Sequence, residues 1–295
     1  MVYVMKFEDQ IIDNTVSRLL KGEDYRYEVI NSINAQFLDF SIQFFKDIVA
    51  AKFNFQEINL LWYKKNFILN NQLSSDEIAI YSGINKKTIT NICGGAKKDI
   101  VVNVAEVNFK YLTHLIRELE EDPDHKLNIQ IKITYNDITV ELALAESLLV
   151  LNALATKKIA IRGGAWSSIG KRVEKPLMIE LCRICKVDPK HYNADIFKKD
   201  KSVLVNREVD FKLYSRSRKE IRCEVKLMGK GNPESADAVI ARDSDVFIAD
   251  TLSSANKKQL ESLNIEYLSL KDNNQETNIR NFIKILDKLD VPYER

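Results

Sequence analysis

The feature that most constrains the fold is an alternation of apolar and polar residues on either side of a polar cluster, Ser215 to Arg218. Two alternating runs flank this cluster, and together they extend from Asp210 to Leu227. Because successive side chains of a strand point to opposite faces, a period of two around a polar turn predicts a β-hairpin. One face of this hairpin is expected to be buried, and its residues are Phe211, Leu213, Ile221, Cys223, Val225 and Leu227.

The opposite face of this hairpin carries charged residues. If the hairpin is symmetric about Ser217, Asp210 lies across from Glu224 at about 5 Å, and Lys226 shares their face. Two ionised carboxylates this close repel each other unless a cation joins them, and Mg²⁺ prefers such oxygen ligands. The pattern therefore indicates a metal-dependent phosphodiesterase in which Lys226 orients a water or stabilises charge at phosphorus. The alternative is an ordinary charged hairpin face, since Asp-x-Lys also occurs elsewhere in the chain.

The distribution of charge points to the same kind of substrate. With 295 residues, 45% hydrophobic and 29% charged, the chain is typical of globular proteins and long enough for two domains. Its net charge is only +2, yet the segment from Thr156 to Lys230 holds twenty Lys or Arg and nine Asp or Glu. Basic residues concentrated around paired carboxylates favour a polyanionic partner, nucleic acid first, over a merely solvated lysine-rich face.

The cellular compartment is inferred from apolar stretches and cysteines. No run approaches eighteen apolar residues, and the first ten residues lack the plan of a secretion signal, so we expect a cytoplasmic protein that does not interact with membranes. Four cysteines agree with a reducing compartment. Cys182 and Cys185 lie in an apolar helical stretch, where buried thiols are expected rather than a zinc or redox site.

A second constellation lies between Leu73 and Gly95, where the spacing of apolar residues and of Gly83 meets that of a helix-turn-helix over residues 75–93. Ser75 is expected to cap the first helix, and Gly94 to end the second. Ile89 and Ile92 are expected to bury the second helix. Its polar face resembles that of a recognition helix in a major groove, and the alternative is a helical hairpin that does not touch DNA. The residues expected to contact DNA are Asn85, Lys86, Lys87, Thr88, Thr90 and Asn91.

The rest of the chain predicts a mainly helical domain, residues 1–156, followed by an α/β domain, residues 157–295. Helices are expected over residues 7–70, 105–121 and 146–155, with a hairpin over residues 127–144. The junction is placed at Thr156-Lys157-Lys158, and Ser167 or Ser168 is expected to cap the next helix.

That next helix has a predicted buried stripe of Ile169, Val173, Leu177, Leu181 and Ile184, and Pro176 is expected to kink it. Glu174 falls outside the stripe. It is either a further metal ligand near the hairpin or an ordinary surface glutamate.

After the hairpin, Asn232 is expected to cap a helix whose N–H groups hold a DNA phosphate, and Lys230 lies beside it. Strands over residues 245–250 and 265–270 then alternate with helices over 255–263 and 278–289. Hairpin, helix, strand, helix, strand describes a mixed α/β sheet covered on both faces.

This order, with Asp210 on one strand and Glu224-Val225-Lys226 on the next, resembles the PD-(D/E)XK nuclease fold of many type II restriction endonucleases. Val209 stands where that motif has proline. From about Arg162 to Leu270 the resemblance becomes closer. The strings RGGAWSSIGKRVEKPLM, CEVKLMGKGNPESADAV and VFIADTLSSANKKQL are similar to restriction endonucleases of the CfrBI type.

The resemblance implies Mg²⁺-dependent cleavage of double-stranded DNA within a short palindrome, with CCWWGG as a candidate target and 5′-phosphate ends. It implies that Asp210 and Glu224 are metal ligands, with the Val225 carbonyl as a third, and that Lys226 positions the attacking water. Glu174 is a further catalytic candidate.

The resemblance also implies a homodimer, and a twofold protein matches the two half-sites of a palindrome. A cognate DNA methyltransferase is the expected functional partner. Two alternatives remain open: a helix-turn-helix regulator with an inactive nuclease-like domain, and another nuclease of the same fold, such as a junction resolvase.

Overall fold

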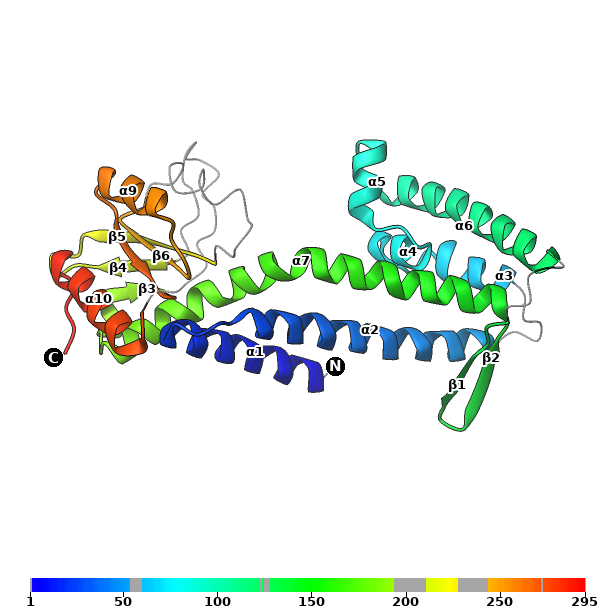
Figure 1. Ribbon diagram of the computed structural model, residues 1–295, viewed down its shortest axis with the longest axis horizontal. Helices are drawn as coiled ribbons and strands as arrows, with labels where there is room; N and C mark the ends of the chain where they lie inside the picture. The colour runs from blue at the N-terminus through cyan, green and yellow to red at the C-terminus, as the bar shows by residue number, and fades with distance from the viewer. Residues whose placement is uncertain are drawn as a thin grey trace. The chain divides into compact units, whose positions relative to one another are not determined.

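The computed structural model describes residues 2–53, 60–122, 124, 128–193, 211–227, 244–271 and 273–294, with side chains from residue 9 onwards (Figure 1). Contacts between Cα atoms divide the chain into two compact units. Unit 1 comprises Met1–Ser32 and Ala165–Arg295, and unit 2 comprises Ile33–Gly164. Among the helices that are described, none is both long enough and apolar enough to cross a membrane.

Unit 1 is discontinuous in sequence. Its first helix, α1 (Val2–Lys21), packs against its last, α10 (Gln275–Lys288). The Asn278 side chain reinforces this contact by donating to the carbonyls of Leu20 at 3.0 Å and Leu270 at 2.9 Å. The predicted division at residue 156 assigns residues 1–32 to the helical domain, whereas their contacts place them with the C-terminal sheet.

Unit 1 contains a five-stranded mixed sheet in the order β3-β4-β5-β6-β7. β3 pairs antiparallel with β4, and β4 with β5, whereas β5, β6 and β7 are parallel. The strands are β3 (Tyr192–Asn193), β4 (Phe211–Tyr214), β5 (Glu220–Lys226), β6 (Val246–Ala249) and β7 (Glu266–Ser269). Helix α9 (Ser254–Ser262) connects β6 to β7, and α10 follows β7 (Figure 1). The predicted mixed α/β fold is confirmed.

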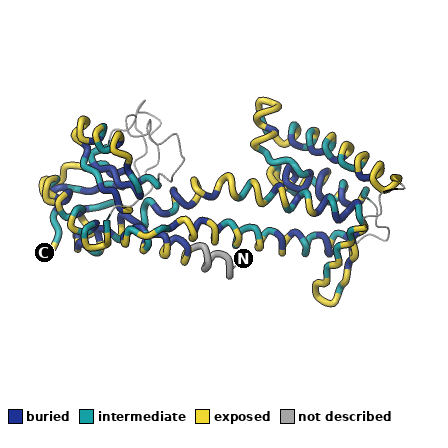
Figure 2. The backbone as a smooth tube through the Cα atoms, in the orientation of Figure 1, coloured by how far each residue is buried: buried dark blue, intermediate teal, exposed yellow. Residues whose placement is uncertain are grey.

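One face of this sheet packs against α9. Leu260 of α9 forms a buried cluster with Phe247 and Ala249 of β6, together with Leu252 and Ile265. Every residue of β6 is buried, as Figure 2 shows for much of the sheet. The apolar run predicted to be a buried strand is therefore an internal strand of the sheet, between β5 and β7.

Helix α7 (Leu144–Ile184) is a single helix of 41 residues, and it includes residues 156–158, where the junction between the domains was predicted. Thr156 is buried, and its hydroxyl donates to the Asn152 carbonyl one turn earlier, at 2.8 Å. The ammonium groups of Lys157 and Lys158 lie 4.8 and 4.7 Å from the ring centroids of Phe40 and Phe37 on α2. These cation–π contacts hold the basic segment in a packed helix rather than in a linker.

The second half of α7 confirms the predicted buried residues but not the predicted helix start. Four of the five stripe residues are buried as predicted, and Ile184 is half-buried. Ser167 and Ser168 lie within the helix, so neither caps it, and Pro176 also lies inside. Cys182 and Cys185 are buried free thiols, as predicted, and burial raises the pKa of both, that of Cys185 to about 11. Both cysteines are therefore protonated packing residues at neutral pH.

Unit 2 is mainly helical, and six aromatic residues belong to its buried core: Phe44, Trp62, Tyr63, Phe67, Tyr81 and Phe109. Its elements are the later part of α2 (Arg26–Phe53), α3 (Leu60–Tyr63), the π-helix η1 (Lys64–Ile68), α4 (Ser75–Tyr81), α5 (Lys86–Cys93), α6 (Lys98–Glu121), β1 (Ile131–Tyr135), β2 (Ile138–Leu142) and the first half of α7. The predicted hairpin of β1 and β2 is confirmed. It turns through Asn136 and Asp137, whose φ values of 49° and 62° suit a two-residue turn between antiparallel strands.

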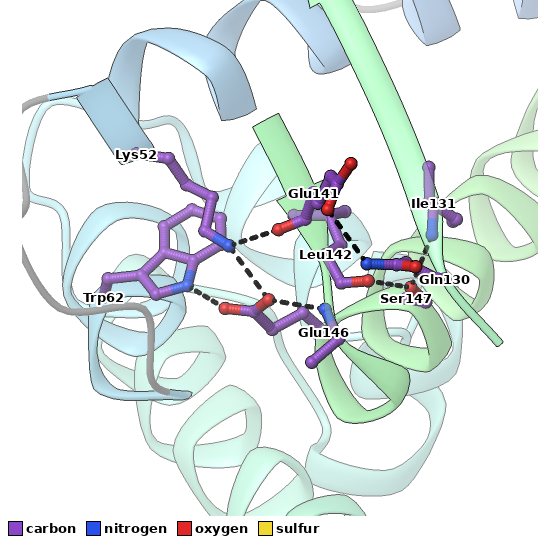
Figure 3. Close-up of polar contacts among 9 residues, drawn as sticks. Lys52, Trp62, Gln130, Ile131, Glu141, Leu142, Glu146 and Ser147 are labelled. Atoms are coloured by element: carbon purple, nitrogen blue, oxygen red, sulfur yellow. Dashed lines mark hydrogen bonds and ion pairs between the residues drawn. The ribbon is translucent and has the colours of Figure 1, made fainter. Parts of the chain in front are cut away.

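A buried ion pair joins the elements of unit 2 (Figure 3). The Lys52 ammonium of α2 lies 3.0 Å from Glu146 Oε2 at the start of α7, and both side chains are almost fully buried. Trp62 of α3 donates its indole N–H to Glu146 Oε1 at 2.5 Å, and the Ala143 N–H donates to Oε2 at 3.0 Å. Lys52 also donates to the Glu141 carbonyl of β2 at 3.1 Å. Burial lowers the pKa of Lys52, and its hydrogen bond to Glu146 opposes that shift.

Lys52→Ala is expected to lower the free energy of unfolding of unit 2 by about 3–5 kcal/mol, because it leaves the Glu146 carboxylate buried without its ammonium partner. The measurement is urea unfolding followed by fluorescence in a Trp166→Phe background, where Trp62 is the remaining one of two tryptophans. Lys132→Ala is the matched control, since Lys132 pairs with Glu141 at 3.3 Å on the surface and its loss should cost at most about 0.5 kcal/mol. Equal effects of the two substitutions would contradict a structural role for the buried pair.

Candidate active site

The site is built on the hairpin of β4 and β5, whose register is symmetric about Ser217 as predicted. Phe211 pairs with Cys223, Leu213 with Ile221, and Tyr214 with Glu220. The chain reverses between Ser215 and Lys219, where the Ser215 N–H donates to the Lys219 carbonyl at 3.1 Å. Arg218 supports this turn with a φ of 65°.

The two faces of the hairpin differ in burial as the alternation predicts. Five of the predicted apolar residues are fully buried, and Leu227, at the end of the run, is half-buried. On the other face, Lys212, Tyr214, Arg222 and Lys226 are half-buried, whereas Glu224 is only 4% exposed. The carboxylate of Glu224 is therefore the buried charge of an otherwise partly exposed polar face.

Glu224 and Lys226 lie on the same face of β5, and they form an ion pair with 3.9 Å between Oε1 and Nζ. This distance exceeds that of a hydrogen bond, so the contact is electrostatic. The Lys226 side chain keeps 30% of its exposure, whereas that of Glu224 keeps 5%. The arrangement presents a solvent-accessible ammonium beside a buried carboxylate.

The parallel neighbour β6 shapes the surroundings of this pair. Glu224 is in register with Phe247, and Lys226 with Ala249. Residues in register on neighbouring strands share a face of the sheet, so the pair lies on the face that α9 covers. A carboxylate held among apolar neighbours needs a nearby positive charge, because burial alone disfavours its ionised form.

Asp210, Lys230 and Asn232 lie outside the described residues. Val225 is described, and it lies fully buried between Glu224 and Lys226 on β5. Within the ranges that the structure describes, no three His, Cys, Asp or Glu side chains form a group that could hold a metal ion.

Glu174 is half-buried on α7, next to the buried Val173. It lies in unit 1, the unit that also contains the hairpin. Its role in catalysis stays a prediction.

The segment predicted to be a helix-turn-helix forms two short helices, α4 and α5, joined by residues 82–85. Gly83 turns the chain with a φ of 84°, and Gly94 ends α5 with a φ of 69°, as predicted. The cap of α4 is Ser74 rather than Ser75, because Ser74 accepts from the Glu77 N–H while the Glu77 carboxylate accepts from Ser74.

Helix α5 is held in unit 2 by Ile89, which is fully buried, whereas Ile92 is 75% exposed. The prediction that Ile92 is buried is wrong. The reason is the length of α5, which has eight residues and ends one residue later, so it packs through its first apolar residue alone.

The predicted DNA-contact residues of α5 fall into two groups. Lys87, Thr88, Thr90 and Asn91 are exposed. By contrast, Asn85 caps the helix by accepting from the Thr88 N–H at 2.9 Å, and Lys86 lies 3.5 Å from Asp76 of α4. The exposed group is available to a partner, and its contact with DNA stays a prediction.

The residues that sequence reasoning missed are Tyr25 and Asp250. Asp250 follows β6, is 3% exposed, and donates its backbone N–H to the Lys226 carbonyl at 3.3 Å. The hydroxyl of Tyr25 donates to Asp250 Oδ2 at 2.9 Å across a separation of 225 residues. The acidic end of the strand DVFIAD was visible in the sequence, but no local signal connects it to Tyr25.

Comparisons with known proteins identify the family of this chain. No curated protein and no solved structure matches the chain. The family model described as CfrBI restriction endonuclease matches residues 9–257, which include the hairpin, β6 and α4–α5. Because the match covers most of the sequence, the chain belongs to the CfrBI restriction endonuclease family, a family of type II restriction endonucleases.

Proposed function

We propose that this restriction endonuclease cleaves both strands of DNA at a short palindrome with the help of Mg²⁺, and that its catalytic centre lies on β5. The observation that carries the proposal is the pair of Glu224 and Lys226, a buried carboxylate and a half-buried ammonium 3.9 Å apart on one face of a strand. This combination suits phosphodiester hydrolysis, because the attacking water and the phosphate must be held and negative charge builds up at the phosphoryl oxygens.

Lys226 is the residue proposed to act on the reacting groups. Its ammonium reaches solvent and can donate hydrogen bonds to the attacking water and to a phosphate oxygen. Donors aimed at developing negative charge in a site of low dielectric stabilise the transition state strongly. The intact pair argues against the alternative of a regulator with an inactive nuclease-like domain.

The donors of β5 fit a hard divalent cation. Glu224 supplies a buried carboxylate, and the Val225 carbonyl is the proposed backbone ligand. Asp210 is the proposed second carboxylate, because the alternating pattern of the sequence and the family resemblance both predict that role for it. When bound, Mg²⁺ supplies charge neutralisation at the phosphate and acidifies water. Glu174 is proposed as a further catalytic group of unit 1.

For the DNA itself, the proposed contacts come from both units. In unit 2 they are the exposed residues of α5, with Asn85 and Lys86 at its start. In unit 1, Lys230 and Asn232 are the proposed phosphate contacts. A palindromic site implies a homodimer, because two identical half-sites are matched by a twofold axis. CCWWGG is the proposed target, the cytoplasm the proposed compartment, and a cognate methyltransferase the proposed functional partner.

Lys226→Ala is expected to reduce DNA cleavage by at least about 10²–10³-fold while DNA binding is retained, because it removes a donor to the transition state. Purified protein is incubated with phage and plasmid DNA, with Mg²⁺ or with EDTA, and the fragment ends are sequenced. Asp210→Ala should be equally inactive. Lys219→Ala, at an exposed position in the turn of the same hairpin, is the matched control and should cleave normally.

Discrete Mg²⁺-dependent fragments that share one palindrome would establish the proposed function and its target. Nicking of branched DNA without sequence preference would favour a junction resolvase instead. Retained cleavage by Lys226→Ala would remove β5 from the active centre.

Glu224→Gln is expected to weaken Mn²⁺ binding at least about tenfold, since an amide replaces the buried carboxylate proposed as a ligand. The measurement is calorimetric titration of the protein bound to a duplex with a non-hydrolysable linkage at its site. Glu220→Gln is the control, because Glu220 begins the same strand and pairs on the surface with Lys212 at 2.7 Å. Identical Mn²⁺ affinities of the two variants would exclude Glu224 as a ligand.

Lys87→Ala is expected to weaken DNA binding uniformly across sequences and to reduce the slope of log K against log salt by about 0.9, the loss of one phosphate contact. Binding is measured by fluorescence anisotropy between low and physiological salt, with Ca²⁺ in place of Mg²⁺. Lys132→Ala, on the surface of β1, should leave the slope unchanged. If Lys87→Ala also leaves it unchanged, α4 and α5 are a packing unit only.

A further inference from the structure

Tyr25 and Asp250 form a buried hydrogen-bonded pair within unit 1. Each residue is only 3% exposed, and the Tyr25 hydroxyl donates to Asp250 Oδ2 at 2.9 Å. Tyr25 immediately precedes α2, whereas Asp250 immediately follows β6. Burial, followed by the charge of Asp250, raises the pKa of Tyr25, so its hydroxyl stays a donor at every working pH.

The backbone of Asp250 connects the ends of the strands on both sides of β6. Its N–H donates to the Lys226 carbonyl of β5 at 3.3 Å. Its carbonyl accepts from the Lys271 N–H, just beyond β7, at 2.8 Å. The hydrogen bond to β5 is therefore made to the backbone of the proposed catalytic lysine itself.

The ring of Tyr25 is held independently of its hydroxyl. It packs edge-to-face against Trp166 of α7, with 6.2 Å between ring centroids and 77° between planes. Such a contact fixes a ring in one orientation. The Tyr25 ring thus has a packing contact of its own, and its hydroxyl donates to a carboxylate that is buried from water.

We infer that Tyr25 and Asp250 are a positioning pair that fixes Lys226 at the end of β5 for DNA cleavage. The inference rests on the proposed role of Lys226. A buried carboxylate that loses one of its hydrogen-bond donors is less well stabilised in its position, so the side chain shifts and displaces its backbone. The 3.3 Å hydrogen bond to Lys226 is already long, so a small displacement of Asp250 breaks it. A shift of about 1 Å in a catalytic group can reduce a rate about 10²-fold.

Two other tyrosines provide matched controls. Tyr267 on β7 donates to the Glu261 carboxylate at 2.8 Å near the surface, so Tyr267→Phe removes the same type of hydrogen bond from the same sheet. Tyr63 donates to the Tyr81 carbonyl at 2.8 Å in the core of unit 2, so Tyr63→Phe removes a buried tyrosine hydrogen bond far from β5 in the sequence. Tyr267→Phe controls for the loss of a tyrosine–carboxylate hydrogen bond elsewhere in the sheet. Tyr63→Phe controls for a general loss of stability.

The test is Tyr25→Phe in the full chain, compared with wild type and both controls. We expect its single-turnover cleavage rate to fall about 10- to 100-fold, while the dissociation constant for DNA in Ca²⁺ stays within about twofold. Hydrogen exchange should become faster at residues 223–227 and 246–251. Tyr267→Phe and Tyr63→Phe should cleave at the wild-type rate.

A double-mutant cycle separates a coupled pair from two independent residues. If Tyr25 acts through Asp250, the Tyr25→Phe/Asp250→Asn double variant loses less activity than the product of the two single losses. Losses that multiply overturn the inference, as does a wild-type cleavage rate in Tyr25→Phe. A rate loss that Tyr63→Phe reproduces also overturns it, because stability alone would then explain the effect.

The experiments distinguish failure of the proposed nuclease function from failure of the positioning role. If the wild-type chain cleaves no DNA, the proposed function falls, and hydrogen exchange still decides whether the pair fixes Lys226. Unchanged exchange at residues 223–227 in Tyr25→Phe overturns the positioning role whether or not the chain is a nuclease.

Discussion

The antiparallel pairing of β4 with β5 is the interaction on which the candidate site depends. Successive residues of a strand point to opposite faces, so a shift of one residue in this pairing would move Glu224 and Lys226 to the other face of the sheet. That shift is excluded because the turn after Ser215 fixes the register and because it would expose the buried apolar residues of the hairpin. On its other side, β5 is fixed by β6, whose register places Phe247 and Ala249 beside the two charged residues. The position of the charges is thus set by apolar burial.

Glu146 of unit 2 and Glu224 of unit 1 are both buried carboxylates, and their surroundings differ. Glu146 receives an indole N–H, a backbone N–H and the Lys52 ammonium, all within 3.0 Å (Figure 3). Such a carboxylate is fully occupied with holding helices together. Glu224 instead lies 3.9 Å from the ammonium of Lys226, which also reaches solvent. A buried carboxylate beside an accessible ammonium is the arrangement on which the proposed catalytic centre is based.

The sequence predicted the elements whose signal is local. Period-two alternation gave the hairpin and its symmetric register, and the order of strands and helices after residue 244 was also correct. Other features depend on packing that the local pattern does not show. Thr156-Lys157-Lys158 reads as a linker, but these residues are helical, and the two lysines make cation–π contacts with Phe37 and Phe40. Ile92 fits the pattern of a buried residue, yet it is exposed, and α5 packs through Ile89. No periodic pattern in the sequence predicts the contact between Tyr25 and Asp250, because the two residues are far apart in the chain.

The discontinuity of unit 1 also determines when the unit can be completed. Because α1 packs against α10 and Tyr25 reaches Asp250, the unit that contains β5 needs both its first and its last segments. Contacts between such distant segments form slowly, and domains emerge from the ribosome in order of synthesis. The hairpin is therefore made well before the helix that completes its unit. Unit 1 can therefore be completed only after α10 has been synthesised, although its first helix is made at the start.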